Sequence, residues 1–195
     1  QSFFIPSSCG GGVKSLKKIE NLLKSGADKV LINSYATRNP KFINDASKIF
    51  GSQCISVGVD AFFRDSLYEV WINYGRERTH LNFLDWIKKI QDLGAGEIIL
   101  TSINNDGTGK GFDERLIELA FDNIKTPLVF GGGCGKIDQV VSLIKNFPKL
   151  SGVSISTALH YNYYKDVFDS KYYSEYKNRN VSFDIGNTEF IINTS

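Results

Sequence analysis

Two stretches decide the fold: PSSCGGG (Pro6–Gly12) and PLVFGGG (Pro127–Gly133), in each of which a short strand-like run ends in three glycines. An amphipathic helical pattern follows each triplet, and a second apolar run follows each helix. These second runs are VLINS (Val30–Ser34) and VSIST (Val153–Thr157), and both end in small polar residues. The sequence therefore contains one strand–GGG–helix–strand unit near its start and another near its end.

Three glycines at the carboxyl end of a strand carry no side chains that would block the backbone. Their N–H groups can therefore approach an anion such as phosphate closely. A single triplet is explained equally well by a tight turn without a ligand. Two triplets in the same context favour a duplicated anion-binding site.

The bulk composition indicates a globular protein. Of the 195 residues, 42% are hydrophobic and 23% are charged, which is typical of a soluble domain with one sizeable core. The net charge of +2 argues neither for nor against nucleic acid, but no basic stripe with interleaved aromatic residues occurs, so we expect no nucleic-acid partner. No apolar run approaches the ~20 residues that a membrane-spanning helix needs, so we expect no membrane partner.

The cysteines and the first residue of the chain bear on metal binding, on the cellular compartment and on the completeness of the N-terminus. Cys9, Cys54 and Cys134 have neither metal-binding nor disulfide spacing, and with only two histidines we expect no metal and no cofactor. The odd number of cysteines and the lack of a signal peptide predict a cytoplasmic protein. The chain starts at Gln1 and contains no methionine, which indicates an incomplete N-terminus.

Apolar runs alternate with amphipathic stretches and predict six strand–helix units. We expect strands at Ser2–Cys9, Lys29–Asn33, Cys54–Val59, Glu97–Ile103, Pro127–Phe130 and Gly152–Ser156. We expect helices at Ser15–Ser25, from the N-cap Asn39 to Gly51, from the N-cap Asn82 to Gly94, at Glu114–Phe121 and at Asp138–Phe147. A hairpin is predicted over Leu67–Ile72 and the residues around Arg76, with its turn near Tyr74 and Gly75.

Strict alternation of strands and helices implies a parallel sheet of the α/β class. Polar residues and glycines cluster at the carboxyl end of every strand. This pattern favours a (β/α)8 TIM barrel with one active face over a doubly wound sheet with one switch point. The run FGGGCGKI is not a P-loop, because Phe130 and Ile137 stand where glycine and serine or threonine are required.

A closed barrel needs eight strands, and the sequence supplies six. We therefore predict an N-terminally incomplete barrel that holds the third to eighth strand–helix units, with its first and last strands facing a gap. Residues 1–178 form this partial barrel, and residues 179–195 form a C-terminal tail.

Five runs carry a resemblance to a known family: IPSSCGGGV, SGADKVLINSYATRNP, VGVDA, GAGEIILTSINNDGTGKGFD and FGGGCGK. They resemble the cyclase subunit of imidazole glycerol phosphate synthase, colinearly from Pro6 to about Tyr161 and beginning at the family's third strand. The pattern LTSI (Leu100–Ile103) separates this subunit from its sibling, the phosphoribosylformimino isomerase of the same pathway. The family's fold is a (β/α)8 barrel of two similar halves, which agrees with the duplicated triplet.

The resemblance implies a bisphosphorylated small-molecule substrate, with one phosphate at each end and hence two anion sites. It places Gly12, Asn33 and Ser34 at one phosphate. Around the other it places Asp106, Gly107, Gly133, Ser156 and Thr157.

The resemblance also implies a partner, a glutaminase subunit that supplies ammonia. In the family this subunit docks at the amino-terminal face of the barrel and completes a heterodimer. Lys29 and Glu97 stand at the starts of their strands and match residues of the ammonia entrance. Asp28 would lie at the docking surface.

The family's reaction closes the imidazole ring in histidine biosynthesis: ammonia attacks a ketone of a ribulosyl-formimino substrate, water leaves, and a carbon–nitrogen bond breaks. Each step moves protons, so the reaction needs a general acid/base pair. Asp60 matches one carboxylate of that pair. It is also the best candidate from the residues alone, since it ends an apolar strand on the expected active face. The alternative is a structural carboxylate that accepts hydrogen bonds from loop N–H groups.

The family's other catalytic carboxylate ends the first strand, which this sequence does not contain. We therefore expect the 195 residues by themselves to be inactive. Three positions depart from the family pattern: Asn104 replaces a common aspartate, Phe62-Phe63 replaces basic residues, and His80 replaces a glycine. These departures leave open a paralogue that uses ammonia to amidate a nucleotide-linked sugar in surface polysaccharide synthesis, and a non-catalytic phosphate-binding fragment.

Overall fold

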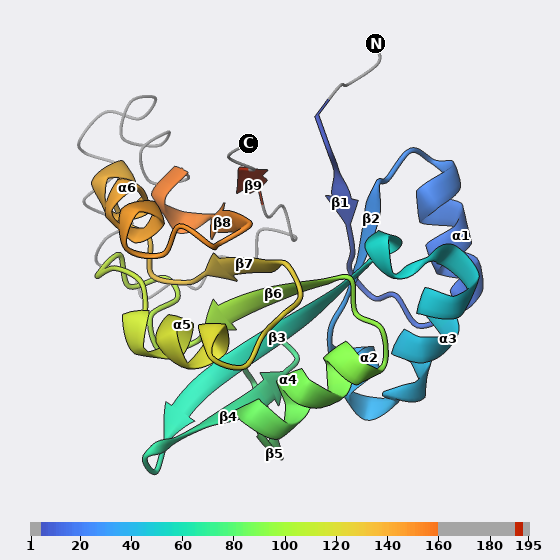
Figure 1. Ribbon diagram of the computed structural model, residues 1–195, viewed down its shortest axis with the longest axis horizontal. Coiled ribbons are helices and arrows are strands. Elements are labelled where there is room, and N and C mark those ends of the chain that lie inside the picture. Colours follow the sequence, from blue (N-terminus) through green and yellow to red (C-terminus); the bar gives the residue numbers. More distant parts are fainter. Residues whose placement is uncertain (1–4, 160–189, 193–195) are drawn as a thin grey trace, which may run out of the picture.

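The computed structural model describes residues 5–159 and the backbone of residues 190–192. Its centre is one sheet in which six parallel strands follow one another in sequence order and curl into part of a barrel (Figure 1). These strands are β1 Ser8–Cys9, β2 Lys29–Ile32, β3 Ile55–Arg64, β6 Glu97–Ser102, β7 Leu128–Gly131 and β8 Gly152–Ile155. The prediction of an α/β fold with six units of a (β/α)8 barrel is confirmed.

Helices connect the parallel strands and cover one face of the sheet (Figure 1). They are α1 Leu16–Lys24, α2 Ser34–Arg38, α3 Lys41–Phe50, α4 Phe83–Asp92, α5 Glu114–Phe121 and α6 Ile137–Asn146, with a short 3-10 helix η1 Ser52–Cys54. Side chains cap three of them: Ser15 accepts from the N–H of Lys18 in α1, and Asn82 and Asp113 do the same for α4 and α5. These caps satisfy N–H groups that a helix start leaves without a partner.

The start of α3 differs from the prediction. The sequence predicted Asn39 as its N-cap, whereas Pro40 holds that position and the helix begins at Lys41. Asn39 instead ends α2, where its N–H donates to the carbonyl oxygen of Tyr35. The helix α2 was not predicted, because five residues are too few to show a helical period.

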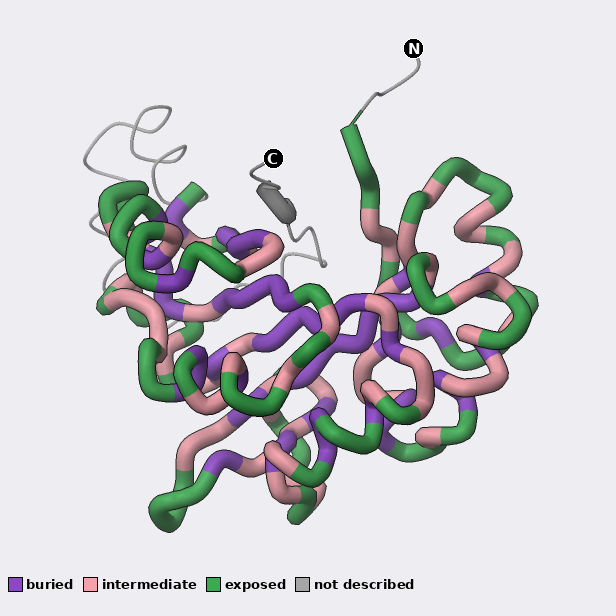
Figure 2. The backbone as a smooth tube through the Cα atoms, in the orientation of Figure 1, coloured by how far each residue is buried: buried purple, intermediate pink, exposed green. Residues whose placement is uncertain are grey.

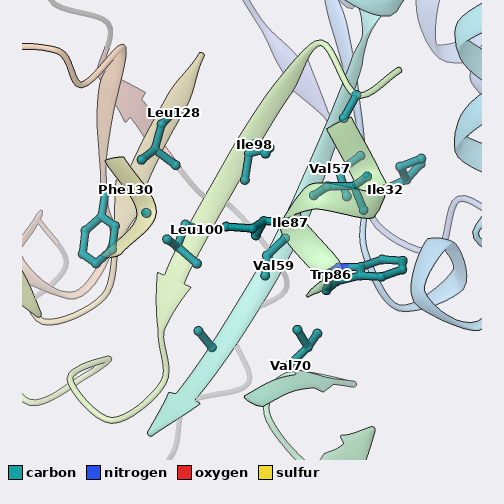
Figure 3. Packing of buried hydrophobic residues seen from close by; sticks show 14 of the residues in the cluster. Ile32, Val57, Val59, Val70, Trp86, Ile87, Ile98, Leu100, Leu128 and Phe130 are labelled. Carbon is teal, nitrogen blue, oxygen red and sulfur yellow. The ribbon is translucent and has the colours of Figure 1, made fainter. Parts of the chain in front are cut away.

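The face of the sheet beneath the helices is apolar. Side chains alternate along each strand, and every second one points toward the helices. Figure 3 shows these side chains around Trp86 and Ile87 of α4, together with Val70 of the hairpin strand β4: Ile32, Val57, Val59, Ile98, Leu100, Leu128 and Phe130. All are nearly or fully buried, and Figure 2 shows burial concentrated along the central strands.

The third strand is longer than predicted. The sequence placed its end at Val59, whereas β3 continues through Asp60 to Arg64 and turns back into an antiparallel hairpin. The hairpin strands are β4 Leu67–Ile72 and β5 Glu77–Asn82. Asp60 interrupts the apolar run after Val59, so the sequence analysis ended the strand there although Phe62 and Phe63 continue it. The predicted β4–β5 hairpin is confirmed, with Asn73 and Tyr74 at φ 53° and 60° in its turn.

The far edge of the sheet also differs. The strand β9 (Phe190–Ile192) pairs antiparallel with β8, so the prediction that β8 faces a gap is wrong. This pairing satisfies edge N–H and C=O groups that an open strand would expose. β1 forms the other edge of the described sheet. The predicted boundary between residues 178 and 179 lies outside the described residues.

Two searches of the described residues were negative. None of the helices in these ranges is long and apolar enough to cross a membrane. The same residues contain no group of three or more histidine, cysteine, aspartate or glutamate side chains that could hold a metal ion.

Candidate functional site

The face of the sheet opposite the helices carries polar residues near the carboxyl ends of the strands. The pairing register places Asp60 of β3 beside Thr101 of β6. Gly131 of β7 and Ser154 of β8 continue the same row. Parallel α/β sheets hold their ligands at this end of the strands. Asp60 therefore lies where the sequence predicted a site, although it stands within its strand rather than at the end.

Asn33 holds the carboxylate of Asp60. Its Nδ2 donates to Oδ2 of Asp60 over 3.0 Å. The amide passes over Gly58, where an added Cβ would lie 3.1 Å from Asn33 Nδ2. Glycine at this position therefore leaves room for the hydrogen bond. The Oδ1 atom of Asn33 is buried and has no hydrogen-bond partner among the described residues.

The first glycine triplet lies in an exposed loop between β1 and α1. Gly11 and Gly12 have φ values of 92° and 58°, which glycine adopts without strain. Lys18 reaches back from the first turn of α1, and its Nζ donates to the carbonyl oxygens of Gly11 (3.0 Å) and Gly12 (3.4 Å). The sequence did not predict this contact. The feature of the sequence that could have predicted it is the position of Lys18, three residues after the N-cap Ser15.

Asn33 and Ser34 leave the sheet at the same end as this loop, because β1 and β2 pair in parallel. The Oγ of Ser34 accepts a hydrogen bond from the backbone N–H of Asn73 over 3.0 Å. Its own hydrogen can still be donated to an anion. The structure thus brings Gly12, Asn33 and Ser34 to the ends of two neighbouring strands.

The second glycine triplet packs closely against the loop that follows β6. The N–H of Gly111 donates to the carbonyl oxygen of Gly133 over 2.9 Å. An added Cβ at Gly133 would lie 2.1 Å from the oxygen of Gly111, and one at Gly132 would lie 2.5 Å from the oxygen of Ser102. Close backbone contact therefore requires both glycines with or without an anion, so the tight-turn alternative stays open for this triplet.

The other residues predicted around the second phosphate also lie at the carboxyl end of the sheet. Asp106 and Gly107 are exposed in the loop after β6, whereas Ser156 and Thr157 follow β8. Because β7 lies between β6 and β8, these loops and Gly133 leave three consecutive strands of the sheet. Local loss of hydration raises the pKa of the Asp106 carboxyl, although its side chain remains exposed overall.

Lys29 and Glu97 form an ion pair at the opposite, amino-terminal end of the sheet. Each is the first residue of its strand. Glu97 is buried, with 7% of its surface exposed, and its Oε1 accepts a hydrogen bond from Ser56 Oγ over 2.7 Å. Asp28, predicted at a docking surface, is exposed on this side and accepts a hydrogen bond from the N–H of Ser7 over 2.7 Å.

The hairpin adds two residues that the sequence analysis did not place at the site. Trp71 of β4 pairs directly with Asp60, so both side chains point to the same face. Phe62 lies two residues beyond Asp60 on that face, and its ring centroid is 5.0 Å from that of Trp71. The alternation in LYEVWI is the sequence signal for Trp71, because it separates this tryptophan from Tyr68, Val70 and Ile72 on the buried face.

Two of the departures from the family pattern have structural explanations. The side-chain oxygen of Asn104 accepts from the N–H of Phe63 over 2.6 Å, and its amide nitrogen donates to the Phe63 oxygen over 3.3 Å. An ionised aspartate cannot donate, so the amide ties the hairpin to the loop after β6 in a way that aspartate could not. His80 has φ 60° beside an irregularity between Val70 and Trp71, which explains why glycine suits this position.

Comparison with known proteins agrees with this architecture. The model of the family described as histidine biosynthesis protein matches residues 1–165. The imidazole glycerol phosphate synthase subunit HisF of Bacillus cereus (strain G9842) is 45% identical over 143 residues, which are 73% of this chain and 57% of the relative. The subunit HisF of Hydrogenobaculum sp. (strain Y04AAS1) is 43% identical over 146 residues, 74% of this chain and 58% of the relative. The chain thus spans slightly more than half the length of these relatives.

Proposed function

Because the chain belongs to the histidine biosynthesis protein family, we propose that it forms most of a cyclase site of the imidazole glycerol phosphate synthase type. The observation that carries this proposal is the position of Asp60. It lies on the face of the parallel sheet opposite the helices, held by Asn33, between loops that each contain a glycine triplet. The reaction would use ammonia to close the imidazole ring of a bisphosphorylated ribulosyl-formimino substrate in histidine biosynthesis.

Asp60 is the proposed general acid/base. The hydrogen bond from Asn33 fixes the orientation of its carboxylate and stabilises its charged form. A carboxylate in this position can take a proton from the attacking nitrogen and return one to the leaving oxygen. Thr101, beside Asp60 in the register, supplies a hydroxyl on the same face.

The two phosphates of the substrate would bind at the two groups of loops. At the first, Gly12, Asn33 and Ser34 offer backbone and side-chain donors, and the Lys18 ammonium adds positive charge. The residues proposed around the second phosphate are Asp106, Gly107, Gly133, Ser156 and Thr157, of which Ser156 and Thr157 have hydroxyls that can donate. Their loops leave neighbouring strands of one sheet, which supports a single site.

Ammonia would enter at the other end, beside Lys29 and Glu97, and travel along the face opposite the helices to Asp60. Asp60 lies four positions after Ser56 on β3, roughly 13 Å at the rise of a strand. Gly58 and Ile99 pair between them on this face, and neither carries a group that would protonate ammonia. The partner would be a glutaminase subunit docked at this amino-terminal end near Asp28, forming a heterodimer in the cytoplasm.

A second candidate function is the paralogue that amidates a nucleotide-linked sugar. The observation that favours it is Phe62 on the site face, where the resemblance leads us to expect a basic residue. In that case the ammonia path and the phosphate loops would remain, and the acceptor would change. The third hypothesis, a non-catalytic fragment, predicts phosphate binding without any turnover.

The test is ammonia-dependent turnover of the bisphosphate substrate. The described sheet has six parallel strands and eight close such a barrel, so we expect the 195 residues alone to be inactive. A chimera that adds the first strand–helix units of the Bacillus cereus relative should be active. Asp60→Asn in the chimera should lower kcat by about 10²–10⁴-fold. The control Asp65→Asn makes the same change in an exposed hairpin turn and should leave kcat unaltered. Equal activity of the Asp60 variant would refute the proposed role, and an inactive chimera that binds phosphate would favour the other two hypotheses.

A further inference from the structure

The face of the hairpin that carries Asp60 also carries an aromatic pair, Phe62 and Trp71, that does not pack into the hydrophobic core. Phe62 and Trp71 pack against each other at 56° between ring planes. Neither belongs to the buried core or to the partly buried side chains packed against it. Both remain half-buried, on the continuation beyond Asp60 of the sheet face opposite the helices.

The neighbouring aromatic pair on the other face of the hairpin behaves differently. The Phe63 and Tyr68 rings have centroids 4.9 Å apart, and Tyr68 packs against Phe83 of α4. The hydroxyl of Tyr68 donates to the carboxylate of Asp113 over 3.0 Å. Phe63 and Tyr68 therefore join the hairpin to the core, so the hairpin does not need Phe62 and Trp71 as its anchor.

Two buried polar atoms beside Asp60 lack partners among the described residues. They are Nε1 of Trp71, a donor, and Oδ1 of Asn33, an acceptor. Trp71 pairs across the sheet with Asp60, and Asn33 is hydrogen-bonded to it. Buried polar groups without partners are rare in folded proteins, so a donor and an acceptor on two residues that adjoin Asp60 point to a ligand that completes them.

We propose that Phe62 and Trp71 form a stacking wall for a planar heteroaromatic ring of the ligand that binds at Asp60. This inference rests on the proposed site and names the part of the substrate that the hairpin recognises. A flat ring would lie against the wall, and a polar ring edge would face Trp71 Nε1 and Asn33 Oδ1. Stacking of a base on an aromatic side chain tolerates many rings, because every base has a π-face.

The test compares ligands with and without a base. Adenosine 5′-monophosphate, adenosine, ribose 5-phosphate and inorganic phosphate are titrated into the chain by calorimetry. Adenosine 5′-monophosphate should bind about tenfold more tightly than ribose 5-phosphate, the size expected for one stacked base. Phe62→Leu should remove most of this advantage. The matched control Phe63→Leu changes the adjacent ring on the core face and should keep it.

Tryptophan fluorescence reports the contact independently. The chain has two tryptophans, and Trp86 is buried in the core at 2% exposure. In Trp86→Phe the remaining emission comes from Trp71, and adenosine should quench it whereas ribose should not. If Trp86→Phe does not fold, the same titrations on the unaltered chain and on Trp71→Phe give the contribution of Trp71 by difference.

Two results together would refute the proposed stacking wall: equal affinities for adenosine 5′-monophosphate and ribose 5-phosphate, and tryptophan emission that adenosine does not change. These results would not contradict the proposed phosphate sites. Quenching by adenosine without any binding of phosphate or ribose 5-phosphate would support the wall and refute the proposed phosphate sites. The two failures are therefore distinguishable.

Discussion

Replacing Lys29 should destabilise the protein more than replacing Glu97, its partner in the ion pair at the amino-terminal end of the sheet. Glu97 is buried, whereas 37% of the Lys29 side chain is exposed. Lys29→Met would leave a buried carboxylate whose remaining hydrogen-bond partner among the described residues is Ser56 Oγ. Breaking a buried pair in this way costs about 3–5 kcal/mol, and partial access of water to the Lys29 position reduces the expected loss to about 2–3 kcal/mol.

Glu97→Gln should cost less, about 1 kcal/mol, because the amide oxygen can still accept from Ser56 and the lysine can turn to water. The double variant should recover stability relative to Lys29→Met, since it removes the unpaired buried charge. Urea unfolding at pH 7 measures the three free energies. As a control, Lys41→Met breaks the exposed pair with Asp45 and should cost less than about 0.5 kcal/mol. A loss from Glu97→Gln equal to or larger than that from Lys29→Met would refute this reasoning.

Three further predictions concern single side chains. Gly58→Ala should push the Asn33 amide away from Asp60 and so weaken the hydrogen bond between them. In the chimera that completes the barrel, this change should lower kcat about tenfold, the value of one hydrogen bond, with little change in melting temperature. An unchanged kcat would contradict this prediction. His80→Gly should raise the free energy of unfolding by about 0.5–1 kcal/mol in urea, because it relieves a left-handed backbone, and a lower value would show that His80 is not strained. The raised pKa of Asp106 means that folding favours its protonated form, so the stability of the unaltered chain relative to Asp106→Asn should rise as pH falls through that pKa. Urea unfolding of both proteins at pH 7 and pH 4 tests this, and a difference in stability that does not change with pH would contradict it.

The sequence predicted the parallel part of the fold well because its signals are local. Apolar runs such as Ile55–Val59 and the cap at Asn82 depend on neighbouring residues alone. The extension of β3 beyond Asp60 depends instead on antiparallel pairing with β4, and this pairing cannot be predicted from the residues of β3 alone. The strand β9 was missed for a similar reason, since its pairing with β8 joins distant segments.

The candidate site was predictable where strand ends define it. Asp60 and the first glycine triplet follow from the rule that ligands bind near the carboxyl ends of parallel strands, whereas the role of Asn33 came from the resemblance. Lys18 and Trp71 did not follow, because their roles depend on how a helix start folds back and on which hairpin residue faces Asp60. The resemblance suggested a phosphate at Gly133, whereas the structure adds a packing reason for the same glycine.

The most direct test of the account is to find where phosphate binds. In crystals of the chain soaked in phosphate, the account predicts two anions at the carboxyl end of the sheet. One should lie among the N–H groups near Gly12 and Asn33 with Lys18 close by, and the other near Gly133 and Thr157. Density at both places would support a site built for a substrate with two phosphates. Density at neither place would contradict the central claim.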